Sequence, residues 1–156
     1  MNPRLNRRQL LCRAALLLGG GCVCHLACGA TSKSTCCDTP TLEPASLTVG
    51  EKQLTIDLAR APSLDAPDCA ARIKLEDRAL DILVVRTGDK EFKALEGRCT
   101  HAGRPLSYVV TRRLLQCNNF GHSLFDLQGA VVKGPAEKPL KSHAVGQQDG
   151  RLHITL

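Results

Sequence analysis

Two short clusters of cysteine and histidine constrain the fold of this 156-residue chain more than any other feature. The first cluster reads Cys99-Thr-His101, and the second reads Cys117-Asn-Asn-Phe-Gly-His122. Cysteine and histidine together suit zinc, copper or iron–sulfur clusters. Fifteen residues separate the two pairs, which is enough for a strand that leads away from the first pair and another that returns. The sequence therefore predicts two loops that meet at one metal site.

The ligand types and their spacing narrow the choice of metal. Structural zinc sites usually place two to four residues between paired ligands, whereas one residue separates Cys99 from His101. A blue-copper site needs one Cys, two His and usually a Met, but Met1 is the only methionine and the second Cys would be surplus. A two-iron cluster takes two thiolates on one iron and two imidazoles on the other. Two loops with one Cys and one His each match this pattern; zinc, or a disulfide with two surface histidines, are the alternatives.

The residues around both clusters resemble those of Rieske iron–sulfur domains. The first loop of that family reads C-x-H-x-G, as do Cys99, His101 and Gly103 here. The second loop of the family reads C-x-x-H-G-S, followed by an aromatic residue and Asp. Its features are echoed here by Cys117, His122, Ser123, Phe125 and Asp126. A third, proline-containing loop usually covers the cluster, and Pro135 lies in the corresponding place, so that the resemblance spans about residues 80–140.

The resemblance implies one [2Fe–2S] cluster and one-electron exchange with redox partner proteins, without a substrate site in this chain. The expected ligands are Cys99, His101, Cys117 and His122. The residues expected around these ligands are Gly103, Gly121, Ser123 and Pro135. An electron carrier outside the cytoplasm is the leading hypothesis. The alternatives are the iron–sulfur subunit of a quinol-oxidising cytochrome bc or arsenite-oxidase-like complex, and a zinc- or disulfide-stabilised binding module without redox function.

The second loop departs from the family pattern in its length. Four residues lie between Cys117 and His122, where the family has two. Gly121 could adopt a positive φ and so absorb the longer loop. Phe125 stands where quinol-oxidising members often have Tyr, and the missing hydroxyl removes a hydrogen bond to a ligand sulfur. Hydrogen bonds to sulfur stabilise the reduced cluster, so we expect a lower reduction potential than in those members.

After residue 46, the sequence pattern predicts an all-β domain over residues 47–156, with antiparallel sheets in a sandwich or barrel. The resemblance implies that this domain is Rieske-like, with both loops at its tip. No segment after the N-terminal region keeps a helical periodicity over ten residues. Short alternating or β-branched runs indicate strands instead. These runs cover residues 53–58, 71–75, 80–87 and 91–95, the approach to Cys117, and two hairpins with turns at Gln128-Gly129 and Asp149-Gly150. The core must be aliphatic, because only 3% of the residues are aromatic.

Residues 1–30 predict an export signal, with a basic start, an apolar run and then small residues. Arg7-Arg8 before Leu10-Leu11 resembles the twin-arginine signal, whose route carries folded, cofactor-loaded proteins. The alternative is a retained anchor that associates the protein with the membrane. Residues 31–46, rich in Ser, Thr and Pro, predict a linker. We therefore expect a protein that lies in the periplasm or is attached to the membrane facing it.

The remaining cysteines and the charge bear on partners. Export into an oxidising compartment favours a disulfide between Cys69 and either Cys36 or Cys37.

The formal net charge is +6, but four of the arginines lie in the first 30 residues, and the rest of the chain has 17 basic and 15 acidic residues. No basic cluster is interleaved with aromatic residues, so we expect no nucleic-acid binding. Arg112-Arg113 indicates either a solvated turn or a docking patch for an acidic partner.

Overall fold

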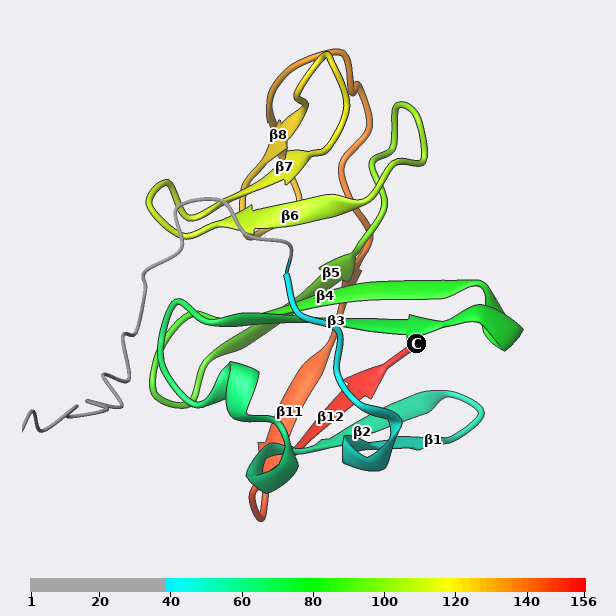
Figure 1. Cartoon of the computed structure of the whole chain (residues 1–156), viewed down its shortest axis with the longest axis vertical. Coiled ribbons are helices and arrows are strands. Elements are labelled where there is room, and N and C mark those ends of the chain that lie inside the picture. Colours follow the sequence, from blue (N-terminus) through cyan, green and yellow to red (C-terminus); the bar gives the residue numbers. More distant parts are fainter. Residues whose placement is uncertain (1–38) are drawn as a thin grey trace, which may run out of the picture. The chain divides into compact units, whose positions relative to one another are not determined.

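The computed structural model of the chain describes residues 39–156 (Figure 1). The described residues belong to the second of two compact units, Lys33–Leu156. The predicted export signal, the first part of the predicted linker, and Cys36 and Cys37 lie outside the described residues. Within the described part of the chain, no helix is long and apolar enough to cross a membrane.

Three four-stranded antiparallel sheets build the fold, which confirms the predicted all-β class (Figure 1). The first sheet has the order β1 (Leu47–Val49), β2 (Gln53–Asp57), β12 (Arg151–Thr155), β11 (Val145–Gln148). The second has the order β10 (Ser142–His143), β5 (Phe92–Glu96), β4 (Leu80–Arg86), β3 (Ala70–Leu75). The third has the order β6 (Leu106–Val109), β7 (Leu114–Cys117), β8 (Leu124–Phe125), β9 (Val131–Lys133). The helices in residues 39–156 are single 3-10 turns, η1 (Pro44–Ser46), η2 (Leu58–Arg60), η3 (Pro62–Leu64) and η4 (Glu76–Arg78).

Strand β4 is buried on both faces and contributes to two separate cores. Successive side chains of a strand point to opposite faces. Ile82 and Val84 therefore pack between the first and second sheets, whereas Leu83 and Val85 pack toward the third sheet. A strand covered on both sides reads as a continuous apolar run, which explains the sequence Ile-Leu-Val-Val at this place.

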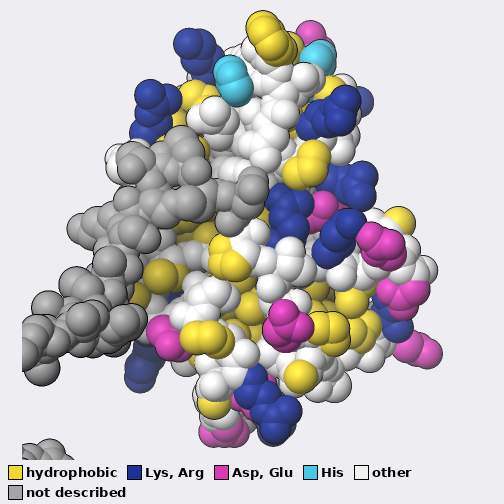
Figure 2. Space-filling view, viewed as in Figure 1, with side chains coloured by type: hydrophobic (Ala, Val, Ile, Leu, Met, Phe, Trp, Pro, Cys, Tyr) yellow, Lys and Arg dark blue, Asp and Glu magenta, His cyan; other side chains and the backbone are white. Residues whose placement is uncertain are grey.

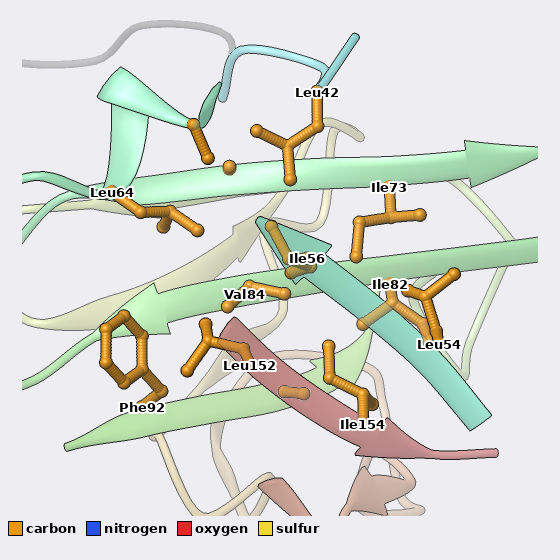
Figure 3. Close-up of a cluster of buried hydrophobic side chains, with 13 residues drawn as sticks. Leu42, Leu54, Ile56, Leu64, Ile73, Ile82, Val84, Phe92, Leu152 and Ile154 are labelled. Atoms are coloured by element: carbon orange, nitrogen blue, oxygen red, sulfur yellow. The ribbon is translucent and has the colours of Figure 1, made fainter. Parts of the chain in front are cut away.

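The core between the first and second sheets is almost entirely aliphatic (Figure 3). The residues that Figure 3 labels are Leu42, Leu54, Ile56, Leu64, Ile73, Ile82, Val84, Phe92, Leu152 and Ile154. Strands β2 and β12 each contribute two of these side chains, and all four are completely buried. Burial of an aliphatic side chain of this size stabilises a fold by about 1.5–3 kcal/mol, so this core needs no metal to hold it together.

The core under the third sheet contains both cysteines of the predicted metal site. Leu106, Leu115 and Phe125 are completely buried there, beside Cys99 and Cys117. The thiols thus occupy positions that apolar side chains fill in the other core. The third sheet consequently positions the site, and the two cysteine side chains of the site form part of the core under this sheet.

The segment before the first strand packs against the domain. The backbone N–H of Leu42 donates to the Arg72 carbonyl (2.8 Å), and the Arg72 N–H donates to the Pro40 carbonyl (2.7 Å). The Tyr108 N–H donates to the Thr39 hydroxyl oxygen (3.1 Å). Residues 39–46, which fall within the predicted linker, therefore cover the free edge of β3 and reach the third sheet.

Candidate metal centre

The thiols of Cys99 and Cys117 meet in the interior, where each residue is only 2% exposed. Cys117 ends β7, and Cys99 follows β5 by three residues, so each of the two predicted loops supplies one thiol. The two side chains lie close enough for each to affect the pKa of the other. The structure thus brings together the two soft ligands that the sequence predicts.

A tight turn forms the first loop. The Cys99 N–H donates to the Arg104 carbonyl (2.8 Å), and the Gly103 N–H donates back to the Cys99 carbonyl (2.8 Å). Gly103 has a φ of +64°, and a Cβ added there would have no neighbour within 4 Å. The turn therefore needs glycine for its left-handed backbone and not for space. This turn also directs the N–H groups of His101 and Ala102 at the Cys99 sulfur.

The second loop closes in a different way from the one predicted. The Cys117 N–H donates to the Ser123 carbonyl (2.9 Å), and the His122 N–H donates to the Asn119 carbonyl (2.9 Å). The positive φ in this loop belongs to His122, at +40°, and not to Gly121. The prediction that Gly121 would absorb the extra residues through a positive φ is therefore wrong.

Gly121 is required for close packing instead. A Cβ added to Gly121 would lie 2.9 Å from Cγ of Pro135, so the second loop rests directly on the third. Non-glycine residues adopt left-handed backbone at a cost, and in this loop the cost falls on His122. The longer loop thus stores its strain at the histidine that the sequence predicts to be a ligand.

The third loop packs against the first and second loops. The Ser123 hydroxyl, which is buried, accepts a hydrogen bond from the Ala136 N–H (3.2 Å) and also reaches the Cys99 thiol. Gly134 has a φ of +106°, and a Cβ there would lie 2.5 Å from Cα of Ser123. The Thr100 hydroxyl donates to the Lys138 carbonyl (2.7 Å) and so ties the first loop to the third.

The two thiols differ in acidity because of their surroundings. Burial opposes ionisation of Cys99, but the N–H groups of His101 and Ala102, the Cys117 thiol and the Ser123 hydroxyl together lower the pKa of Cys99. Burial, together with the hydrogen bond and the charge of Cys99, raises the pKa of Cys117 to about 11. Two thiolates side by side in an apolar interior therefore need a nearby positive charge.

The two histidines are exposed on the same loops but do not join the thiols in this structure. Nδ1 of His122 lies 3.2 Å from Nε2 of Gln116 and 3.3 Å from the Cys117 carbonyl oxygen. Across residues 39–156, no three Cys, His, Asp or Glu side chains come close enough to hold a metal ion. The thiolate half of the predicted site is thus formed, and its imidazole half is present on the loops without converging.

A buried ion pair below the loops was not predicted from the sequence. The Asp81 carboxylate, in a residue 2% exposed, accepts hydrogen bonds from Arg72 (2.9 and 3.0 Å), and Arg98 lies 3.6 Å away. Arg72 also donates to the Leu106 carbonyl at the start of β6. A Cβ on Gly97 would lie 2.1 Å from the Asp81 carboxylate. An acidic residue within an apolar strand run was the signal that could have indicated this junction.

These residues fit a [2Fe–2S] cluster. The donor set provides two buried thiols that need a compensating positive charge, backbone N–H groups and a hydroxyl that lower the pKa of Cys99, and two exposed imidazoles on the same loops. Thiolate pairs with N–H donors around the sulfur are the usual environment of iron–sulfur clusters. Two paired loops on an antiparallel β scaffold thus offer the donor types of an iron–sulfur site.

Comparison with known proteins identifies the family. The sequence pattern of the Rieske [2Fe-2S] domain matches residues 43–144, and the chain belongs to this family. It therefore carries one [2Fe–2S] cluster and transfers electrons through it. The match covers the second and third sheets completely, includes β1 and β2 of the first sheet, and contains both loops.

Individual relatives are more distant. The chain is 31% identical over 84 residues to the carotenoid phi-ring synthase of Chlorobaculum tepidum, and the match covers 54% of this chain and 13% of that enzyme. A chain from a complex of reduced oxygenase and oxidised ferredoxin in carbazole 1,9a-dioxygenase has a similar fold, with a TM-score of 0.55 and 23% identity over 68% of this chain and 94% of the other. The ferredoxin of carbazole 1,9a-dioxygenase from Nocardioides aromaticivorans gives a TM-score of 0.51 and 19% identity over 65% and 96%.

Proposed function

We propose that the chain is an exported one-electron carrier in which Cys99 and Cys117 bind one iron, and His101 and His122 bind the other. The observation that carries the proposal is the buried pair of thiols, one from each loop, with the two histidines exposed on the same loops. When bound, the cluster supplies reversible one-electron chemistry.

The residues of the chain have separate roles in this function. The N–H groups of His101 and Ala102 and the hydroxyl of Ser123 stabilise negative charge on the Cys99 sulfur. The apolar core around both thiols excludes water from that side. The exposed histidines place the other side at the surface, so electrons and protons would exchange there. The histidine pair should also make the reduction potential fall as the pH rises, because protonation of an imidazole stabilises the reduced, more negative centre.

Metal analysis and spectroscopy test the cluster assignment. We expect two iron ions and two labile sulfides per chain, and a rhombic electron paramagnetic resonance signal with a low average g value after reduction by dithionite. Zinc in place of iron would favour the non-redox binding module. His122→Ala should abolish the signal, whereas His153→Ala, which changes a histidine in β12, should leave it intact. A normal signal from His122→Ala would mean that another residue is the fourth ligand.

The N-terminal sequence supports export, and its arginine pair provides the test. We expect the cluster-loaded protein in the periplasmic or membrane fraction of cells that express the full chain. Replacement of Arg7 and Arg8 by Lys should retain the loaded protein in the cytoplasm. Equal distribution of wild type and variant between the fractions would contradict twin-arginine export.

The second candidate function is that of a subunit in a larger oxidoreductase. The similarity to 13% of a much longer enzyme supports it, because a related stretch is there part of a larger chain. The ferredoxin likeness, which covers 96% of that ferredoxin chain, favours the separate carrier. Stoichiometric co-purification with a cytochrome b or a molybdenum subunit would favour the subunit, whereas elution as a free protein would favour the carrier.

A further inference from the structure

Phe120 is completely exposed at the end of the second loop. The other large apolar side chains exposed in residues 39–156 have at most 54% of their surface in contact with water. Phe120 belongs to the four residues that separate Cys117 from His122, so the longer loop presents it next to the proposed ligand. A single exposed apolar residue is common on protein surfaces. The position of Phe120 indicates a binding surface only when it is considered together with the groove next to the second loop.

An open groove of about 560 Å³ lies on the third sheet, next to the second loop. Each strand of the sheet contributes one residue to it, Val109 from β6, Gln116 from β7, Leu124 from β8 and Lys133 from β9. Arg112 and Lys133 are its charged residues, and both are exposed. His122 and Gly121 line it from the second loop. The groove is therefore cationic and touches the proposed ligand.

The part of the chain that contains the site is basic, whereas the other described residues are slightly acidic. Residues 98–140, which contain both loops and the third sheet, have six Lys and Arg against two Asp and Glu, a net charge of +4. The other described residues have ten basic and twelve acidic residues, a net charge of −2. Figure 2 shows several Lys and Arg side chains around the end that carries the histidines. This end is thus complementary to an acidic surface.

We propose that Phe120, Arg112 and Lys133 form the docking surface for a redox partner whose own surface is acidic and contains an apolar pocket. The inference rests on the proposed function, because it assigns a partner to the histidine end of the cluster site. Phe120 would enter the pocket, and acidic side chains would lie along the groove beside Arg112 and Lys133. Both contacts flank His122, so docking would bring the partner's redox centre close to the exposed edge of the cluster.

A protein partner fits this surface better than a lipid bilayer does. A bilayer is bound by a broad apolar face with surrounding cations. Here, one aromatic side chain projects while the neighbouring cations line a groove, and a groove matches a projecting segment of another protein. Vesicles of anionic phospholipid therefore serve as a negative control: stronger binding to such vesicles than to an acidic protein would overturn the proposal.

The test uses two electron acceptors of opposite charge, the acidic protein plastocyanin and the basic protein cytochrome c. Stopped-flow rates of oxidation of the reduced, cluster-loaded protein should fall with added salt for plastocyanin and rise for cytochrome c. Arg112→Gln with Lys133→Gln should slow the reaction with plastocyanin about tenfold at low salt. The control pair Lys90→Gln with Lys93→Gln removes the same charge from the second sheet and its preceding turn, and should change this rate less than twofold.

Phe120 is tested in the same assay. Phe120→Ser should slow the reaction with plastocyanin about tenfold, in the range of an interface hot spot, and Phe120→Leu should restore most of the rate. Binding of the cluster-loaded protein to immobilised plastocyanin, followed by interferometry, gives a readout that does not depend on electron transfer. Equal effects of the groove pair and the control pair, or unchanged binding by Phe120→Ser, would overturn the docking surface. Absence of the iron–sulfur signal would instead contradict the proposed function.

Discussion

The two cores of the molecule differ in what holds them together. The core between the first and second sheets consists of aliphatic side chains and one phenylalanine, and nothing in it needs a cofactor. The core under the third sheet includes two thiols, and their surroundings lower the pKa of Cys99 and raise the pKa of Cys117. The comparison teaches that one part of the domain is a scaffold that hydrophobic burial stabilises, whereas the other should reach its full stability only with the cluster bound.

Loss of a cysteine ligand should separate the two parts most strongly. Cys117→Ser should abolish cluster binding, because serine oxygen is a poor substitute for thiolate on iron. Hydrogen exchange followed by mass spectrometry should then show faster exchange in β6–β9, while β2, β4 and β12 keep their protection. Cys69→Ser, outside the loops, is the matched control and should keep the cluster. Equal loss of protection in all three sheets would contradict the division into scaffold and cluster-dependent part.

The buried ion pair at the junction should have the next largest effect. Asp81→Ala leaves Arg72, whose side chain is only 11% exposed, without its carboxylate. Breaking a buried pair in this way costs about 3–5 kcal/mol, so the free energy of unfolding in denaturant should fall by that amount. Glu76→Ala breaks an exposed pair with Lys74 and serves as the control, with a much smaller expected change.

Asp81 also connects the scaffold to the cluster-binding part. Arg72 is in β3 and donates to the Leu106 carbonyl in β6. The loss of Asp81 should therefore loosen the contact between the second and third sheets. We therefore expect Asp81→Ala to lower cluster occupancy as well as stability. A stable variant with full occupancy would show that the junction is not needed for the site.

The thiol pair should make the metal-free protein sensitive to alkali. The pKa of Cys117 is raised from its ordinary value of 9.0 to about 11, so the folded state holds this proton more tightly than the unfolded state does. The contribution of Cys117 to stability is therefore fully present below pH 9 and is lost as the pH rises through about 11. The loss should be on the order of 2–3 kcal/mol.

A comparison with Cys117→Ser isolates this contribution from the other groups that titrate in the same range. The difference in the free energy of unfolding between the two metal-free proteins should shrink from pH 9 to pH 11. Cys99 has the opposite pH dependence because its pKa is lowered in the folded state. Its contribution to the free energy of unfolding is lost as the pH falls through the folded-state pKa. A constant difference across the alkaline range would mean that folding does not raise the pKa of Cys117.

Most of the scaffold could be predicted from the sequence, and less of the site. Strands β2, β3, β4 and β5 lie within a residue or two of their predicted bounds, because their alternation or apolar runs follow directly from which faces are buried. The short strands β1 and β10 were not predicted. Each has only two or three residues, and their pairing depends on partners that are distant in the sequence.

The site depended on backbone geometry that spacing does not determine. The residue pattern predicted two loops that meet, each with one cysteine, and the structure places both thiols together in the interior. The roles of Gly103 and Pro135 around the ligands stay predictions. The positive φ of His122 and the close packing of Gly121 against Pro135 were not foreseen. The packing involves a loop that lies more than ten residues further along the chain, which the spacing of the second loop does not reveal. The roles of His101 and His122 as ligands stay predictions, since their convergence on a cluster requires the cluster itself.

The smallest expected effect concerns a single hydrogen bond to sulfur. Ser123→Ala removes the hydroxyl that reaches Cys99 and accepts from the Ala136 N–H. Such a bond stabilises the more negative, reduced centre. Its loss should therefore lower the reduction potential, by about 40 mV if the bond contributes about 1 kcal/mol to a one-electron couple. Ser142→Ala, which changes the exposed residue of β10, is the control and should leave the potential unchanged. An unchanged or raised potential in a redox titration of Ser123→Ala would show that the hydroxyl serves the third loop alone, and that the cluster-dependent part gains its electrostatic tuning from backbone N–H groups.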